Sequence, residues 1–209
     1  MSLQAGFGTT IQFTTLPSNT EFGTYNGFAP ATVDGLPNQL LVCDDYDHIT
    51  YVPSGPLQYN LSTLDSLQYA RFVNQSFAIE QADYRQAALL VDGLAHSGPS
   101  QSPDLTADYQ YALWHLFTPG VALNATEQSL FDQTAQSVAS NPNAYSDLYS
   151  RLRIYTPTQA YQSNQEFLEL ADAPEPPAGV LGAIGMTFVF VSYAMRRRLL
   201  KRSLYPQDG

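Results

Sequence analysis

An uncharged apolar run of eighteen residues, Ala178 to Met195, is the feature that most constrains this chain. As a helix it would be about 27 Å long at roughly 1.5 Å per residue, close to the lower limit for crossing a bilayer. Tyr193 lies near its end, where interfacial aromatic residues are common. A buried core helix is the alternative, but such helices are rarely apolar on every side. We therefore predict a single C-terminal transmembrane helix over residues 178–195.

Five basic residues within residues 196–202 predict the orientation of this helix, because Lys and Arg near a span are retained in the cytoplasm. Residues 203–209 would then be a cytoplasmic tail, and the domain before the span would face outward. Such a domain needs an export signal, yet residues 1–18 have neither a basic start nor a long apolar stretch. A cytoplasmic, tail-anchored protein would place the basic block on the wrong side. We therefore expect a signal peptide that precedes this start or has already been processed.

The motif Pro174-Glu175-Pro176 comes just before the apolar run. Its prolines keep the chain extended and end any helix before the membrane, so that a protease can reach the backbone. With the helix and Arg196-Arg197-Arg198, it resembles the PEP-CTERM sorting signal of Gram-negative bacteria that make exopolysaccharide. The resemblance implies that an exosortase, an intramembrane cysteine transpeptidase, recognises residues 173–202 and removes the tail. It also implies a location in the cell envelope or on the extracellular surface, after initial anchoring in the inner membrane with a cytoplasmic C-terminus.

Charge limits the partners of the remaining domain. Residues 1–177 contain four basic and eighteen acidic residues, a formal net charge of −14. This balance argues against nucleic acid and anionic lipid as partners. Charged residues are only 13% of the chain, a composition that favours an exported polar surface over a cytosolic enzyme. Cys43 is the only cysteine, so an intrachain disulfide framework and a multi-cysteine metal site are excluded.

Residues 1–172 are predicted to form one α+β domain, with a β-rich N-terminal half and a helical middle layer. Strands are expected over residues 9–16, 39–46, 152–158 and 165–170, with turns over residues 25–38. Apolar spacings of three and four residues predict helices over residues 61–75, 79–97, 107–117 and 125–140.

Cys43 ends the strand-like run LLVCDDY, and Gln110 lies in the predicted helix DYQYALWHLF. A thiol can attack a glutamine carboxamide and release ammonia, which leaves an internal thioester if water is excluded. Across residues 25–120, these motifs resemble the thioester domains of bacterial surface adhesins. In that resemblance the cysteine falls on Cys43 and the glutamine on Gln110, while Tyr109 stands where the family has threonine. The remaining motif positions fall on Ala112, Leu113 and Trp114.

The resemblance implies that a nucleophile on a partner, such as a surface amine, attacks Gln110 and displaces Cys43. The protein would then be covalently attached through Gln110, and His115, next to Trp114, is a candidate helper in proton transfer. The alternative is a related fold in which Cys43 is an inert buried residue and Gln110 bonds to the backbone. In that case we expect a non-catalytic structural role, with exopolysaccharide bound by a tyrosine-rich surface.

The acidic run CDDYDH offers Asp44, Asp45 and Asp47 as oxygen ligands for Ca²⁺. The spacing, glycine and terminal glutamate of an EF-hand are absent, so solvated turn aspartates are the simpler interpretation and no metal is expected. Neither a G-x-S-x-G nor an H-E-x-x-H motif occurs. We therefore expect neither a conventional enzyme nor a cofactor. The histidines available to a hydrolase are His48, His96 and His115.

Overall fold

The computed structural model describes residues 8–16, 19–21, 24–73, 75–97 and 103–172. The chain divides into two units, residues 1–171 and residues 172–209, and Asp172 alone is described in the second. The predicted transmembrane helix, the sorting motif and the basic block therefore lie outside the described residues. In the described ranges, no helix has the length and apolarity that a bilayer span requires.

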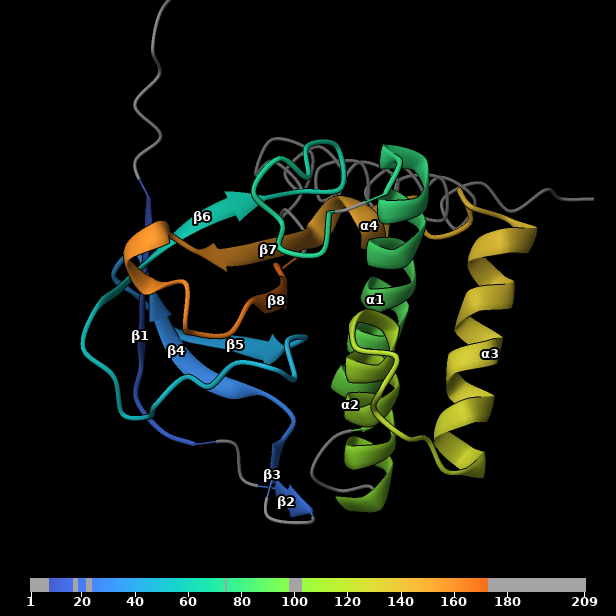
Figure 1. Cartoon of the computed structure of the whole chain (residues 1–209), viewed down its shortest axis with the longest axis horizontal. Helices are drawn as coiled ribbons and strands as arrows, with labels where there is room; N and C mark the ends of the chain where they lie inside the picture. Colours follow the sequence, from blue (N-terminus) through green and yellow to red (C-terminus); the bar gives the residue numbers. More distant parts are fainter. Residues whose placement is uncertain (1–7, 17–18, 22–23, 74, 98–102, 173–209) are drawn as a thin grey trace, which may run out of the picture. The chain divides into compact units, whose positions relative to one another are not determined.

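In the first unit, six described strands form a closed antiparallel barrel (Figure 1). Around the barrel they are β1 (Thr9–Phe13), β4 (Ala29–Val33), β5 (Leu36–Cys43), β8 (Phe167–Leu170), β7 (Leu152–Pro157) and β6 (Leu57–Ser62). A separate hairpin lies between β1 and β4 in sequence and consists of β2 (Asn19–Glu21) and β3 (Thr24–Asn26). Because β7 and β8 come from the end of the domain, the barrel closes only through pairing of segments that are distant in sequence.

The α-helices occupy the interval between β6 and β7 in sequence and lie beside the barrel (Figure 1). They are α1 (Phe77–Ser97), α2 (Pro103–Phe117), α3 (Ala125–Ser140) and α4 (Ser146–Arg151), and a short 3-10 helix, η1 (Gln159–Tyr161), follows β7. Helix α1 packs against both α2 and α3. The start of α3 is set by Asn124, whose side chain accepts the backbone N–H of Glu127 while the Glu127 carboxylate accepts the N–H of Asn124.

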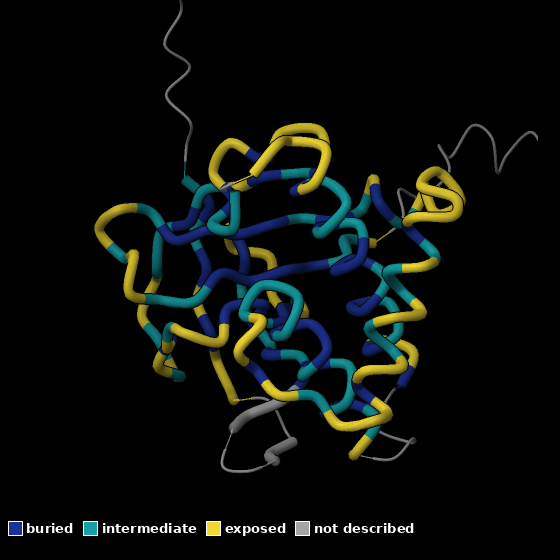
Figure 2. Tube along the Cα trace, turned by 45° about the vertical axis from the view of Figure 1, so that its right-hand side comes forward, coloured by how far each residue is buried: buried dark blue, intermediate teal, exposed yellow. Residues whose placement is uncertain are grey.

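Two apolar clusters hold the strands and helices together, and Figure 2 shows the buried segments in dark blue. The cluster inside the barrel includes Ile11, Phe13, Leu41, Tyr59 and Phe167. The cluster between the strands and the helices includes Val42, Tyr84, Leu90, Leu113 and Leu168. Successive residues of β5 and β8 thus face opposite clusters, as side chains alternate along a strand. For this reason neighbouring residues at the end of β5 have different surroundings.

The predicted α+β class, with strands in the N-terminal half and a helical middle, is confirmed. Helices occur where residues 79–97 and 125–140 were expected to be helical. The helix expected over residues 107–117 begins four residues earlier, at Pro103, because proline is well tolerated in the first turn of a helix. Strands likewise occur at the start of the domain and near its end.

The predicted helix over residues 61–75 is wrong. Strand β6 extends to Ser62, and turns follow, in one of which the Ala70 N–H donates to the Leu67 carbonyl oxygen at 3.0 Å. Leu64, Leu67 and Ala70 are buried. The three-residue spacing of apolar residues here comes from successive turns whose side chains enter the core, and not from a helix.

The stretch of residues 25–38, predicted as turns, contains all of β4 and the start of β5. Pro30 obscured this strand, because proline lacks the N–H that a strand donates. Asp34 and Gly35, with φ angles of 49° and 83°, form the two-residue turn between the strands. Asp-Gly favours this left-handed backbone, so the turn could be predicted from the sequence, whereas the strand before it could not.

Candidate functional site

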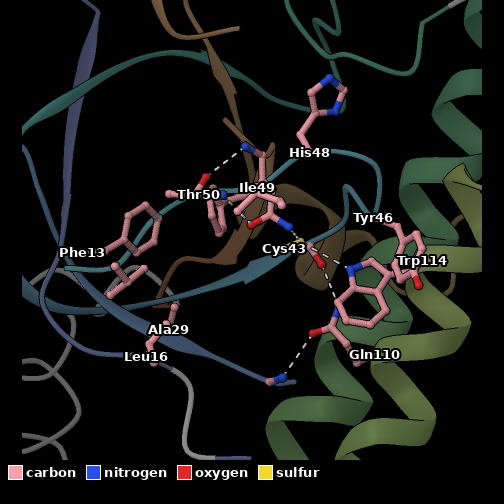
Figure 3. A pocket seen from close by; sticks show the side chains of 14 residues that line it. Phe13, Leu16, Ala29, Cys43, Tyr46, His48, Ile49, Thr50, Gln110 and Trp114 are labelled. Carbon is pink, nitrogen blue, oxygen red and sulfur yellow. Dashed lines mark hydrogen bonds between the residues drawn. The ribbon is translucent and has the colours of Figure 1, made fainter. Parts of the chain in front are cut away.

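Cys43 is the last residue of β5, and the pairing of β5 with β8 brings Gln165 to it. Gln165 Nε2 donates to Cys43 Sγ at 2.9 Å, and Trp114 Nε1 donates to the same sulfur at 3.3 Å (Figure 3). The thiol itself donates to the backbone oxygen of Asp45 at 3.2 Å. The sulfur is therefore held in one position by two N–H donors, one from α2 and one from the residues just before β8.

These surroundings favour a protonated thiol. Burial raises the pKa of Cys43 well above its ordinary value, the hydrogen bond from Trp114 opposes this rise, and the neighbouring Asp44 adds to it. A bare thiolate in such a site would be costly unless donors stabilised it. Trp114 and Gln165 are such donors, and they would also stabilise the charge that develops on sulfur as it leaves an acyl group.

Gln110 presents its carboxamide to the same place from α2. Its side chain is only 1% exposed, Nε2 donates to the Cys43 backbone oxygen at 2.7 Å, and Oε1 accepts the Gly27 N–H at 3.2 Å. Figure 3 shows the carboxamide between these partners. The Gly27 N–H thus faces the oxygen that would become negative during acyl transfer, which is the role of an oxyanion-hole donor.

Gly27 can approach α2 because it has no side chain. Its φ angle is 92°, a left-handed conformation that glycine adopts readily. A Cβ at this position would lie 3.1 Å from the Thr106 side chain of α2. Replacement of Gly27 would therefore strain the backbone and displace the N–H that meets Gln110.

Helix α2 supplies both Gln110 and Trp114 because residues four apart share a helix face. Ala112 and Leu113, from the same motif, are fully buried in the cluster between strands and helices. Tyr109, which stands in the place of a threonine, packs its ring against Gly93 of α1. The helix thus directs Gln110 and Trp114 toward Cys43 of β5, and the other motif residues toward α1 and the core.

The structure does not bring His115 to Cys43 and Gln110. Its Nδ1 lies 2.7 Å from the Val121 backbone oxygen, and its ring packs edge-on against Phe131 of α3 at a centroid distance of 5.0 Å. Successive residues differ in direction by about 100° around a helix, so His115 and its neighbour Trp114 face different elements. The helper role expected for His115 thus has no geometric support, and its contacts are those of α2–α3 packing.

The other two histidines also make their contacts away from the Cys43 thiol and the Gln110 carboxamide. His48 lines the cavity that borders Cys43, with its Nδ1 2.9 Å from Asp45 Oδ1. Figure 3 shows its ring pointing away from Cys43. His96 is on α1, where its Nδ1 contacts Asp92. No described histidine therefore forms a nucleophile–base pair with the Cys43 sulfur.

The three aspartates considered as weak candidates for calcium ligands do not share one site. Asp44 is fully buried, whereas the Asp45 carboxylate forms an ion pair with Arg71 and contacts His48. Asp47 is exposed. Among the residues that the structure describes, no three His, Cys, Asp or Glu side chains form a group able to hold a metal ion. The calcium hypothesis thus has no geometric support.

Asp44 instead belongs to a buried acid pair with Glu166. Neither Asp44 oxygen has a hydrogen-bond partner within the described part of the chain. Burial raises the pKa of Asp44 well above its ordinary value, and the nearby charges of Glu166 and Asp45 raise it further. Glu166 has three donors to its carboxylate, so we assign the negative charge to Glu166 and the proton to Asp44. These donors are the Tyr84 hydroxyl at 2.6 Å, the Arg71 N–H at 2.7 Å and the Thr156 hydroxyl.

Sequence reasoning missed Gln165 and Gly27. Gln165 is the first residue of the predicted strand over residues 165–170, and Gly27 lies in an Asn-Gly turn signal. Neither residue has reactive chemistry of its own. Gln165 and Cys43 are 122 positions apart and meet only because β5 pairs with β8. The pairing of β5 with β8 would have indicated Gln165, whereas no local motif indicates either residue.

No protein-family model and no curated protein matches this chain. Among solved structures, it is similar to the N-terminal thioester domain of a surface protein from Clostridium perfringens, with 12% identity and a TM-score of 0.46, covering 77% of this chain and 98% of that one. It is also similar to the N-terminal domain of the Streptococcus pyogenes pilus tip adhesin Cpa, with 11% identity and a TM-score of 0.45, covering 83% and 98%. Similarity at these TM-scores is loose, so the proposed function rests on the geometry around Cys43 and Gln110.

Proposed function

We propose that Cys43 and Gln110 form an internal thioester, through which the chain attaches covalently to a partner at the cell surface. Backbone bonds to Gln110 fit the inert alternative as well, so the observation that carries this proposal is the pair of N–H donors on the Cys43 sulfur, Trp114 and Gln165, beside the fixed Gln110 carboxamide. The carboxamide nitrogen lies 2.7 Å from the Cys43 backbone oxygen, and its oxygen lies 3.2 Å from the Gly27 nitrogen. A partly buried thiol and a buried carboxamide, each oriented by hydrogen bonds, are the two reactants that thioester formation requires.

In the forming step, Cys43 Sγ attacks the side-chain carbonyl carbon of Gln110. Negative charge develops on Oε1, which faces the Gly27 N–H. The bond from carbon to Nε2 then breaks, and the thiol proton leaves with the nitrogen as ammonia. The product is a bond from Cys43 sulfur to the Gln110 carbonyl carbon, and the atoms balance without a further reactant.

In the attachment step, the nucleophile of a partner attacks the same carbon. The bond from carbon to Cys43 Sγ breaks, while Trp114 and Gln165 stabilise the departing sulfur through their N–H groups. The proton of the nucleophile passes to the sulfur, which regenerates a thiol. The chain is thereby joined to its partner through Gln110 and is consumed in one event, so it does not turn over as an enzyme does.

Exposure of the purified full chain to methylamine, followed by peptide mapping, tests the attachment step. We expect a methylamide on Gln110 and a Cys43 thiol that becomes free at the same time, with no label in Cys43→Ala. The competing function is a non-catalytic matrix protein in which Cys43 is inert. It predicts an unmodified Gln110 and a free Cys43 before any amine is added.

We also propose that residues 173–202 sort this domain to the cell envelope as a PEP-CTERM signal read by an exosortase. The support is the order of the Pro174-Glu175-Pro176 motif, the apolar run and the basic block. In a bacterium that encodes an exosortase, cell fractionation with C-terminal mass analysis should find a truncated chain in the envelope. Glu175→Ala should keep its tail. An intact tail on soluble cytoplasmic wild-type protein would contradict this proposal.

A further inference from the structure

The Cys43–Gln110 pair lies in the wall of a cavity of about 420 Å³ beside α2 (Figure 3). Both residues line it, together with Trp114 and Gln165. The Gln110 side chain is otherwise buried, at 1% exposure. A nucleophile that attacks the Gln110 carbonyl carbon therefore approaches through this cavity, and the atoms next to the nucleophile lie against its walls.

These walls are largely apolar. Phe13, Val52 and Phe167 line the cavity on the barrel side, and Trp114 lines it on the side of α2. Leu16 and Ile49, which also line it, are 40% and 63% exposed. The apolar surface thus continues from the interior of the cavity to solvent, as expected for a site that receives an apolar group from outside.

Among the described residues, no Asp, Glu, Lys or Arg side chain lines this cavity. Asp45 precedes the lining residue Tyr46 in sequence, but its carboxylate is paired with Arg71 and His48. A group with a second positive charge would therefore lose its hydration in the cavity without gaining a counter-ion, which is unfavourable. An alkyl or aryl group would instead gain from leaving water.

We infer that the nucleophile accepted by the Cys43–Gln110 site is a primary amine carried on an uncharged alkyl or aryl group that fills this cavity. The inference rests on the proposed thioester. The amine nitrogen bonds to the Gln110 carbonyl carbon, the bond from that carbon to Cys43 Sγ breaks, and one amine proton passes to the sulfur. The products are a secondary amide on Gln110 and a free Cys43 thiol.

Two amines of equal length test this inference on the purified full chain. Hexylamine has one amine and an uncharged tail, whereas hexamethylenediamine carries a second positive charge at the far end. At equal concentrations of free amine, we expect hexylamine to form its adduct at least about tenfold faster, as followed by intact mass. Equal rates, or a faster reaction of the diamine, would overturn the inference.

A charged variant of the rim provides the matched control. Ile49→Asp places a carboxylate at an exposed position of the cavity wall, so it should leave the fold intact. We expect it to accelerate the diamine, whose second charge gains a counter-ion, and to slow hexylamine, whose tail then meets a charge. An unchanged ratio of the two long amines in this variant would count against the inference.

The outcomes separate the inference from the function on which it depends. A wild-type chain that lacks the mass deficit of ammonia loss refutes the thioester and the inference with it. A chain that has the deficit and reacts with methylamine, yet prefers the diamine, retains the thioester and refutes only the apolar subsite.

Discussion

At the scale of single residues, the Cys43 sulfur is distinguished by its two N–H donors, Trp114 and Gln165. Trp114→Phe keeps an aromatic ring at this position but removes its donor. One hydrogen bond to a developing charge contributes about 1.5–3 kcal/mol, so we expect the rate of methylamide formation to fall roughly 10- to 100-fold. The initial rate, measured by intact mass, checks this expectation.

Tyr46→Phe is the matched control for this substitution. The Tyr46 ring meets Trp114 edge-on at 5.3 Å, and its phenylalanine variant preserves that contact. The control should react at the wild-type rate. If Trp114→Phe also reacts at that rate, the donor has no part in stabilising the sulfur.

The buried acid Asp44 makes stability depend on pH. Burial raises the pKa of Asp44 in the folded chain above the ordinary 3.8. Protonated Asp44 therefore makes its full contribution to the free energy of unfolding below pH 3.8, and this contribution is lost as pH rises through the raised pKa. Asp44→Asn keeps a neutral group in place. We expect it to raise the free energy of unfolding at pH 8 by about 1–3 kcal/mol, and by less at acidic pH.

Urea unfolding between acidic and alkaline pH measures this difference. Asp47→Asn, which changes an exposed aspartate nearby, serves as the control and should leave the pH dependence as it is. Parallel curves of free energy against pH for wild type and Asp44→Asn would show that Asp44 is ionised in the folded chain.

Cys43 and Gln110 could be nominated from the sequence, because a lone thiol and a glutamine in an aromatic helix are recognisable reactants. Their partners could not. Gln165 and Gly27 act through an ordinary amide and a backbone N–H, and only the fold determines where these groups point. His115 shows the converse error, since proximity in sequence to Trp114 did not predict the helix face on which it lies.

At the scale of elements, the approach of α1 to α2 depends on Gly93. A Cβ at Gly93 would overlap the ring of Tyr109, so Gly93→Ala must displace that ring. Alanine favours a helix over glycine by about 1 kcal/mol, but overpacking costs about 1–3 kcal/mol, so we expect a net loss of stability of about 1 kcal/mol.

Thermal or urea unfolding of Gly93→Ala gives the sign of this effect. In a Tyr109→Leu background the same substitution should no longer destabilise the chain, because the overlapping ring is absent. An alanine variant about 1 kcal/mol more stable than wild type, the gain expected from helix propensity alone, would mean that α1 and α2 are not in close contact at this point.

Elements with strong local signals were predictable, and those defined by distant contacts were not. The capping residue Asn124 and a clear apolar period predicted α3 with both of its ends. Residues 61–75 have a similar period, yet their apolar side chains enter the core from turns. Pro30 argued against a strand at β4, because proline lacks the backbone N–H. Strand β4 nevertheless forms, since it pairs with both β1 and β5.

At the scale of the whole molecule, the surroundings of Cys43 and Gln110 are complete only when the barrel is closed. Strand β8 from the end of the domain pairs with β5 from its beginning, and this pairing delivers Gln165 to Cys43. Helix α2, from the middle of the chain, adds Gln110 and Trp114. Partial unfolding of any of the three segments should therefore expose the proposed thioester to hydrolysis, since water exclusion depends on all of them.

The intact mass of the purified chain tests the central claim most directly. If Cys43 and Gln110 form a thioester, wild type is lighter than its sequence by about 17 Da, the mass of one ammonia, whereas Cys43→Ala and Gln110→Ala show no such deficit. Any processing at the ends of the chain affects all three proteins alike, so the comparison among them isolates the thioester. A wild-type chain without the deficit, whose Cys43 is freely alkylated in the folded protein, would contradict the claim.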